Sequence, residues 1–103
     1  MEANIDIIVS FLNENIEIEM SEQNKSRYLP IYLKKLMDIL KLILNERHES
    51  ISFSISIEIN TENTKKAQSL LEEIDENEIL NQSEFSKHLY LYLKYILNKA
   101  NKN

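Results

Sequence analysis

Side chains that commonly carry enzymatic chemistry are few in this sequence. There is no cysteine, which excludes thiol catalysis, thiolate metal sites and disulfides. The histidines are His48 and His88; His48 follows a predicted helix and His88 lies on the flank of another, so a capping or surface role is favoured for both. Loops that cradle phosphates need glycine, and the chain contains none. We therefore expect no enzyme, no bound cofactor and no small-molecule substrate.

Carboxylates are densest in one short stretch, at Glu72, Glu73, Asp75, Glu76 and Glu78. A calcium loop would need a glycine-assisted turn, and a transition-metal site would need histidine or cysteine nearby. Neither accompanies these acids. The stretch therefore predicts a solvated acidic helix end, and no metal site is expected.

The tyrosines fall at helical spacing among leucines, at Tyr28, Tyr32, Tyr90, Tyr92 and Tyr95. Such rings can stack on single-stranded nucleic acid. Packing in a core or an interface is the favoured interpretation, with the hydroxyls at a polar edge.

The net charge of −5 disfavours nucleic acid as a partner. Residues 1–49 hold nine acids and six bases, and residues 50–103 hold eight and six, so neither half has a basic excess. Met1 is followed by Glu2, Ala3 and Asn4 rather than by a basic segment and a long apolar run. We expect no signal peptide, no membrane span and a cytoplasmic location.

Hydrophobic periodicity predicts one domain, residues 1–103, with an N-terminal part (1–49) and a strand-helix-helix part (50–103). Helices are expected over residues 28–47, 61–74 and 83–100. Residues 4–12 fit a helix or a strand, and residues 15–20 fit a short edge strand or a connector. The predicted fold class is α+β, helix-rich, with about four helices and one long strand.

That strand is "SISFSISIEIN", residues 50–60, in which apolar and polar side chains alternate. Its apolar face predicts a dimer or sheet interface formed by Ile51, Phe53, Ile55, Ile57 and Ile59. The strand could pair with its copy in a homodimer or with an N-terminal strand of the same chain. Sequence alone leaves both pairings open.

The last predicted helix is apolar around most of its circumference. Its expected core stripe is Phe85, Leu89, Tyr92, Leu93 and Ile96. Four more residues, Tyr90, Leu91, Tyr95 and Leu97, widen the apolar surface and leave Lys87, Lys94 and Asn98 as the polar side. A helix of this kind must be covered on more than one side, so these four residues are the predicted contacts for a partner or a second subunit.

From Ser50 onward, the order strand, helix, short loop and helix opening with "SEF" resembles the ribbon-helix-helix family of dimeric repressors and antitoxins, over about half of the chain. The resemblance implies a two-chain ribbon with the apolar residues inward. It also implies DNA contacts from Ser54, Ser56 and Glu58, and a phosphate contact at Ser83, which with Glu84 would open the second helix. The DNA-contacting face lacks the family's usual basic or amide side chains, and the loop lacks its usual glycine.

Three functions follow as expectations, one of which is a purely structural, self-assembling subunit. The first is an acidic, non-enzymatic protein-binding module, a homodimeric inhibitor or regulator of the anti-defence, immunity or antitoxin type that mobile elements encode. The alternative is a ribbon-helix-helix dimer that binds operator DNA. Charge favours the first, because an acidic chain gains little from phosphate attraction.

Overall fold

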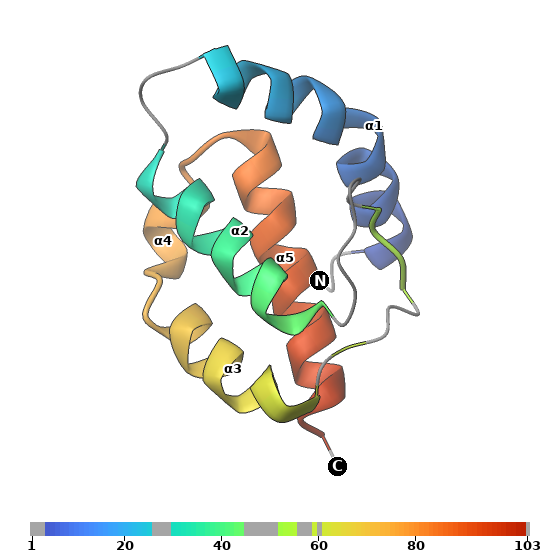
Figure 1. Ribbon diagram of the computed structural model, residues 1–103, viewed down its shortest axis with the longest axis vertical. Helices are drawn as coiled ribbons and strands as arrows, with labels where there is room; N and C mark the ends of the chain where they lie inside the picture. Colours follow the sequence, from blue (N-terminus) through green and yellow to red (C-terminus); the bar gives the residue numbers. More distant parts are fainter. Residues whose placement is uncertain (1–3, 26–29, 45–51, 56–58, 60, 103) are drawn as a thin grey trace.

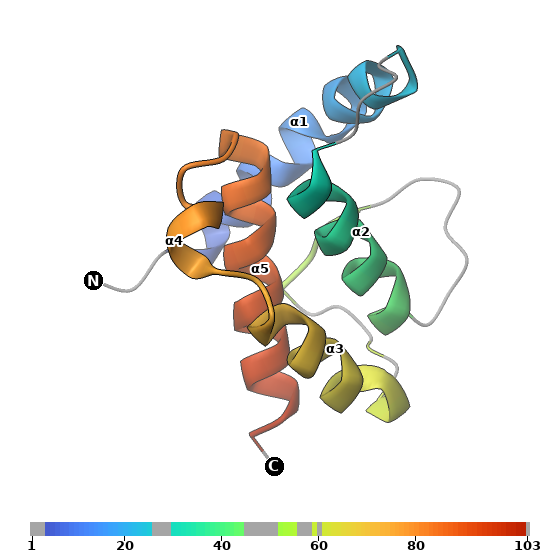
Figure 2. The same cartoon turned by 90° about the vertical axis from the view of Figure 1, so that its left-hand side faces the viewer.

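One long helix, α5 (Glu84–Ala100), forms the centre of the structure, and the other helices pack around it (Figures 1 and 2). The computed structural model describes residues 4–25, 30–44, 52–55, 59 and 61–102. Within these residues the elements are α1 (Ile5–Lys25), α2 (Ile31–Ile43), a short 3-10 helix (Thr61–Asn63), α3 (Thr64–Glu72), α4 (Glu76–Ile79) and α5. The described residues contain no strand, so the predicted α+β class is wrong and the fold is all-α.

The first helix covers both N-terminal segments whose secondary structure the sequence left open. Ile8, Leu12 and Ile16 are buried at intervals of four residues, which gives α1 one apolar side. The alternating residues of both segments are not on one face, because Ile7 is 63 % and Ile18 is 59 % exposed. The alternation in residues 4–12 and 15–20 is therefore incidental, and one 21-residue helix spans both.

The core stripe predicted for α5 is confirmed, since all five of its residues are buried. Contacts within the same chain also explain why the apolar surface of this helix is so broad. Helices α1, α2, α3 and α4 all contact α5, so most of its circumference is covered without a second subunit. The buried residues of α2 include Leu33, Leu36, Met37, Leu40 and Ile43, which form one apolar side of that helix.

Side-chain caps explain where the last two helices begin. Asp75 ends the stretch after α3 and accepts a 2.9 Å hydrogen bond from the backbone N–H of Asn77, which starts α4. No described residue has a positive φ, so α3 ends without a left-handed cap residue. Ser83 then accepts a 3.2 Å hydrogen bond from the backbone N–H of Ser86 and starts α5.

The described residues 52–55 of the predicted strand lie against helices instead of another strand. Phe53 is 3 % exposed and belongs to the core. Its backbone makes two hydrogen bonds with one side chain of α1: the Asn13 amide donates to the Phe53 carbonyl (2.9 Å), and the Phe53 N–H donates to the Asn13 oxygen (2.8 Å). We call residues 52–55 the strap. A side-chain amide here takes the hydrogen-bonding place that a neighbouring strand would fill.

Tyr92 of α5 holds the strap from its other side. The Tyr92 hydroxyl donates a 2.8 Å hydrogen bond to the carbonyl of Ser54, and its ring meets the Phe53 ring edge to face at 5.2 Å. The only β-type pairing among the described residues is one antiparallel bridge between Leu44 and Ile59. For the described residues 52–55 and 59, contacts to α1, α5 and the end of α2 stand in place of the predicted strand pairings with a copy or with residues 4–20.

Replacing Tyr92 with Phe should lower the free energy of unfolding by about 1 kcal/mol near neutral pH, because the hydrogen bond from the Tyr92 hydroxyl to the Ser54 carbonyl is lost. Burial raises the pKa of the Tyr92 phenol, while the Ser54 N–H, which donates to the phenol oxygen at 3.4 Å, acts in the opposite direction. The unfolded phenol therefore ionises first, and this stabilisation is full below about pH 10 and falls as pH rises further. Urea titrations at several pH values should show the difference between wild type and Tyr92→Phe shrinking above that pH.

Tyr95→Phe is the matched control, since Tyr95 is 39 % exposed and lies outside the core. It should leave the free energy of unfolding unchanged at neutral pH. A constant gap between wild type and Tyr92→Phe across the alkaline range would contradict the assigned role of the hydroxyl.

Candidate partner-binding groove

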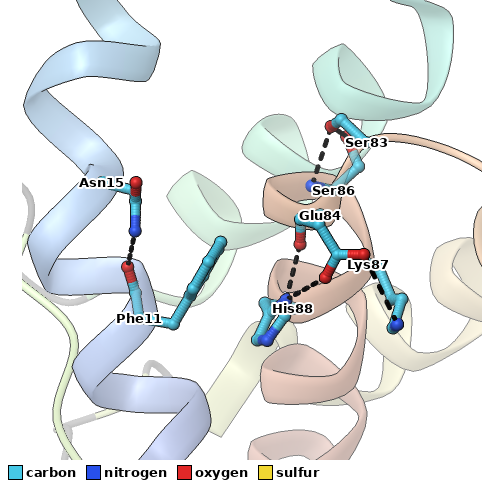
Figure 3. Close-up of polar contacts among 7 residues, drawn as sticks. All are labelled: Phe11, Asn15, Ser83, Glu84, Ser86, Lys87 and His88. Atoms are coloured by element: carbon cyan, nitrogen blue, oxygen red, sulfur yellow. Dashed lines mark hydrogen bonds and ion pairs between the residues drawn. The ribbon is translucent and has the colours of Figure 1, made fainter.

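One contact between α1 and α5 is a stacked pair of rings, Phe11 and His88 (Figure 3). Phe11 of α1 lies on His88 of α5 with ring centroids 3.9 Å apart. His88 Nδ1 is 2.6 Å from the backbone carbonyl of Glu84, which can only accept, so Nδ1 carries the proton. Glu84 Oε2 is a further 3.7 Å contact of the same nitrogen.

These groups make contacts that join α1 to α5 and fix the start of α5. The imidazole is packed on a ring and bonded to its own helix, and the Ser83 hydroxyl is bonded to Ser86 at the helix start. Ser83, expected to grip a phosphate, is therefore engaged as a helix cap. His48 lies outside the described residues.

Farther along the same pair of helices, a groove opens between the start of α1 and the second half of α5. Its volume is about 620 Å³, within the range of ligand-binding clefts. The apolar lining comes from Ile5, Ile8, Leu91 and the ring of Tyr95. The polar lining comes from Lys94, Asn98, Lys99 and Lys102. We call this feature the lysine groove.

The lysine groove contains two of the four residues predicted to contact a partner. Leu91 is half-buried and Tyr95 is 39 % exposed, and both line it. Tyr90 and Leu97 are buried in the chain's own core. The predicted role in partner binding stays a prediction, and burial leaves Leu91 and Tyr95 as the residues that can carry it.

The electrostatics of this region differ from those of the whole chain. Residues 85–102 contain four lysines and no acid, while the rest of the chain holds 17 acids and eight bases, a net charge of −9. Lys94 pairs with Glu76 of α4 at 3.1 Å. Burial raises the pKa of the Tyr90 phenol, and the negative charge of Glu76 adds to this, while Lys94 opposes it.

The residues assigned to the ribbon are only partly described. Phe53 lies in the core, Ile55 and Ile59 are half-buried, and Ser54 is exposed. Ile51, Ser56, Ile57 and Glu58 lie outside the described residues. The family resemblance stays a prediction, but the described part of the strand is used inside one chain.

Comparison with models of known protein families, with curated proteins and with solved structures gives no match. The function is therefore inferred from the geometry of the groove. In the described part of the chain, no three His, Asp or Glu side chains are grouped to hold a metal ion. None of the described helices combines the length and apolarity needed to cross a membrane.

Sequence reasoning missed the α1 side of the groove and two of its lysines. Ile5 and Ile8 were assigned to a segment of undecided structure, and Lys99 and Lys102 were not singled out. A signal for the lysines was present, namely the absence of acids from residues 85–102. No comparable signal identifies Ile5 and Ile8, because their place depends on how α1 packs on α5.

Proposed function

We propose that this chain is a non-enzymatic protein-binding module, a small inhibitor or regulator that engages a partner protein through the lysine groove. The observation that supports this most is the lining of the groove: an aliphatic and aromatic floor beside lysines, on a side of the central helix that the described residues leave open. Interfaces of specific complexes combine an apolar, often aromatic centre with a polar rim in the same way.

The chemistry of the lining favours binding over catalysis. A general acid–base or nucleophilic mechanism needs a reactive group with a partner in hydrogen-bond reach. The groove is lined by ammonium groups, one amide and one phenol, and no carboxylate or imidazole lines it within the described residues. Lysines surrounding an apolar floor can attract, orient and hold a partner without any reaction.

The test is a pull-down with three baits: wild type, Tyr95→Ala and Leu80→Ala. Leu80 is a matched control because it is 43 % exposed, close to the 39 % of Tyr95, and lies outside the groove. We expect a stoichiometric protein partner with wild type and Leu80→Ala, and binding weaker by at least about tenfold with Tyr95→Ala, as for an aromatic residue central to an interface.

Circular dichroism should show the same helix content for all three baits. The proposal fails if wild type retains no stoichiometric partner, or if all three baits retain it equally.

A further inference from the structure

The open side of α5 is a strip that suits another helix. Leu91, Tyr95 and Asn98 follow one another at intervals of four and three residues, so they share one face of α5, and Lys102 lies two residues beyond the end of this helix. At 1.5 Å per residue the helical part of the strip is about 10 Å long, or two helical turns. The start of α1 forms a wall beside it through Ile5 and Ile8. Two helices that leave a groove between them present the shape into which the ridge of a third helix packs.

The charges of the groove indicate that its occupant should be negatively charged. Of its three lysines, Lys94 has an acidic partner, Glu76. Among the described residues, Lys99 and Lys102 have no ion pair. Both lie in the last turn of α5 or just beyond it, where the helix dipole favours a cation, so their placement has a structural reason as well. Their charge is nevertheless available to an incoming carboxylate.

We infer that the partner presents an acidic amphipathic helix to the lysine groove. Its apolar residues, spaced at i, i+3 or i+4 and i+7, lie on Leu91, Tyr95 and the α1 wall, and its flanking carboxylates meet Lys99 and Lys102. This inference rests on the proposed function and adds the chemical class of the partner.

A nucleic acid fits the surroundings less well than such a helix. α1 carries five acids and one base, and Glu76 of α4 pairs with Lys94, one of the lining residues of the groove. A long polyanion would be repelled by these negative charges. A short helix carries only a few carboxylates, and these can lie beside the lysines. The apolar floor also matches aliphatic side chains better than phosphates.

A second copy of this chain is a weaker candidate. The most acidic helix it could offer is α1, whose exposed apolar residues are Ile7 and Ile18. These two lie three turns apart, and the exposed Ser10 and Glu14 fall between them on the same face. A partner helix needs a continuous apolar ridge, which the exposed face of α1 lacks.

The probes are two fluorescent peptides of about 16 residues, long enough to form a helix, with the same leucine pattern and with either Glu or Lys on the flanks. Fluorescence anisotropy with the full chain measures binding at low and high salt. We expect the Glu peptide to bind, to weaken as salt rises, and to weaken about tenfold with the double variant Lys99→Glu/Lys102→Glu. The Lys peptide should not bind.

The matched control is Lys65→Glu/Lys66→Glu, which makes the same charge change at exposed positions of α3. It should leave binding of the Glu peptide within about twofold of wild type. Equal weakening in both double variants would assign the effect to net charge and overturn the inference. So would equal binding of both peptides, or binding of neither.

Two further measurements identify other occupants. Light scattering that shows a dimer of the wild type, dissolved only by Lys99→Glu/Lys102→Glu, would place a second copy in the groove. Single-stranded DNA that binds more tightly than the Glu peptide and is lost in the same variant would place a phosphate chain there. Suppose that a partner is lost in the pull-down with Tyr95→Ala but the Glu peptide does not bind the chain. The proposed function would then stand, and the inference of an acidic helix as the occupant would be wrong.

Discussion

Replacing Phe53 with Ala should lower the free energy of unfolding by about 3–5 kcal/mol, the range for an aromatic residue removed from a core. Phe53 is 3 % exposed and lies edge to face on Tyr92, with contacts to the core formed by the helices. Truncation removes this ring from between α1 and α5 and leaves a cavity that rigid helices cannot fill completely. Urea denaturation followed by circular dichroism measures the change.

Two controls make this result specific. Ile18→Ala removes an aliphatic side chain that is 59 % exposed, so it should change the free energy of unfolding by no more than about 0.5 kcal/mol. The midpoint for wild type should also be independent of protein concentration if Phe53 belongs to the chain's own core. A midpoint that rises with concentration would instead favour a two-chain ribbon. A loss below about 1 kcal/mol in Phe53→Ala would contradict the place of the strap in the core.

Helix positions could be predicted from this sequence wherever burial follows a 3.6-residue period. The stripe of α5 is an example, because Phe85, Leu89 and Leu93 repeat at intervals that leave one face buried. The same holds for Leu33, Leu36 and Leu40 of α2. Such patterns are set by local geometry, so they can be recognised without knowing what covers them.

The strand prediction failed because alternation specifies two faces but not a backbone partner. Phe53 is buried as its pattern predicted, yet its N–H and carbonyl bond to the side chain of Asn13, 40 residues earlier. No sequence rule marks an asparagine as the substitute for a neighbouring strand. Other asparagines make similar long-range bonds to backbone carbonyls, as Asn63 does to Leu42. This use of side-chain amides is visible only in the folded chain.

The candidate site was predictable on its α5 side and not on its α1 side. The breadth of the apolar surface on α5 predicts cover from a partner or a second subunit, because the sequence does not show how many helices surround another. In the described residues, four helices of the same chain contact α5, and the strip with Leu91 and Tyr95 remains open. The distinction between core and interface residues on one helix is a property of tertiary packing.

The second large effect is expected from Asn13→Ala, which should lower the free energy of unfolding by about 2 kcal/mol. The change removes both hydrogen bonds to the backbone of Phe53, each contributing about 0.5–1.5 kcal/mol, and leaves those groups without their partner. Asn24→Ala is the matched control, since Asn24 is an exposed residue of the same helix. Because alanine is the better helix former, that control should be neutral or slightly stabilising.

Two related variants distinguish the hydrogen bonds from general effects of the substitution. Asn13→Asp keeps an acceptor for the Phe53 N–H but places an oxygen against the Phe53 carbonyl, so it should destabilise the fold at least as much as alanine does. In the background of Tyr92→Phe, the cost of Asn13→Ala should fall, because the strap has already lost one of its anchors and the two sites are coupled through it. If Asn13→Ala and Asn24→Ala lower the free energy of unfolding equally, Asn13 does not anchor the strap. Costs of Asn13→Ala and Tyr92→Phe that simply add would mean that the strap is held at two independent points.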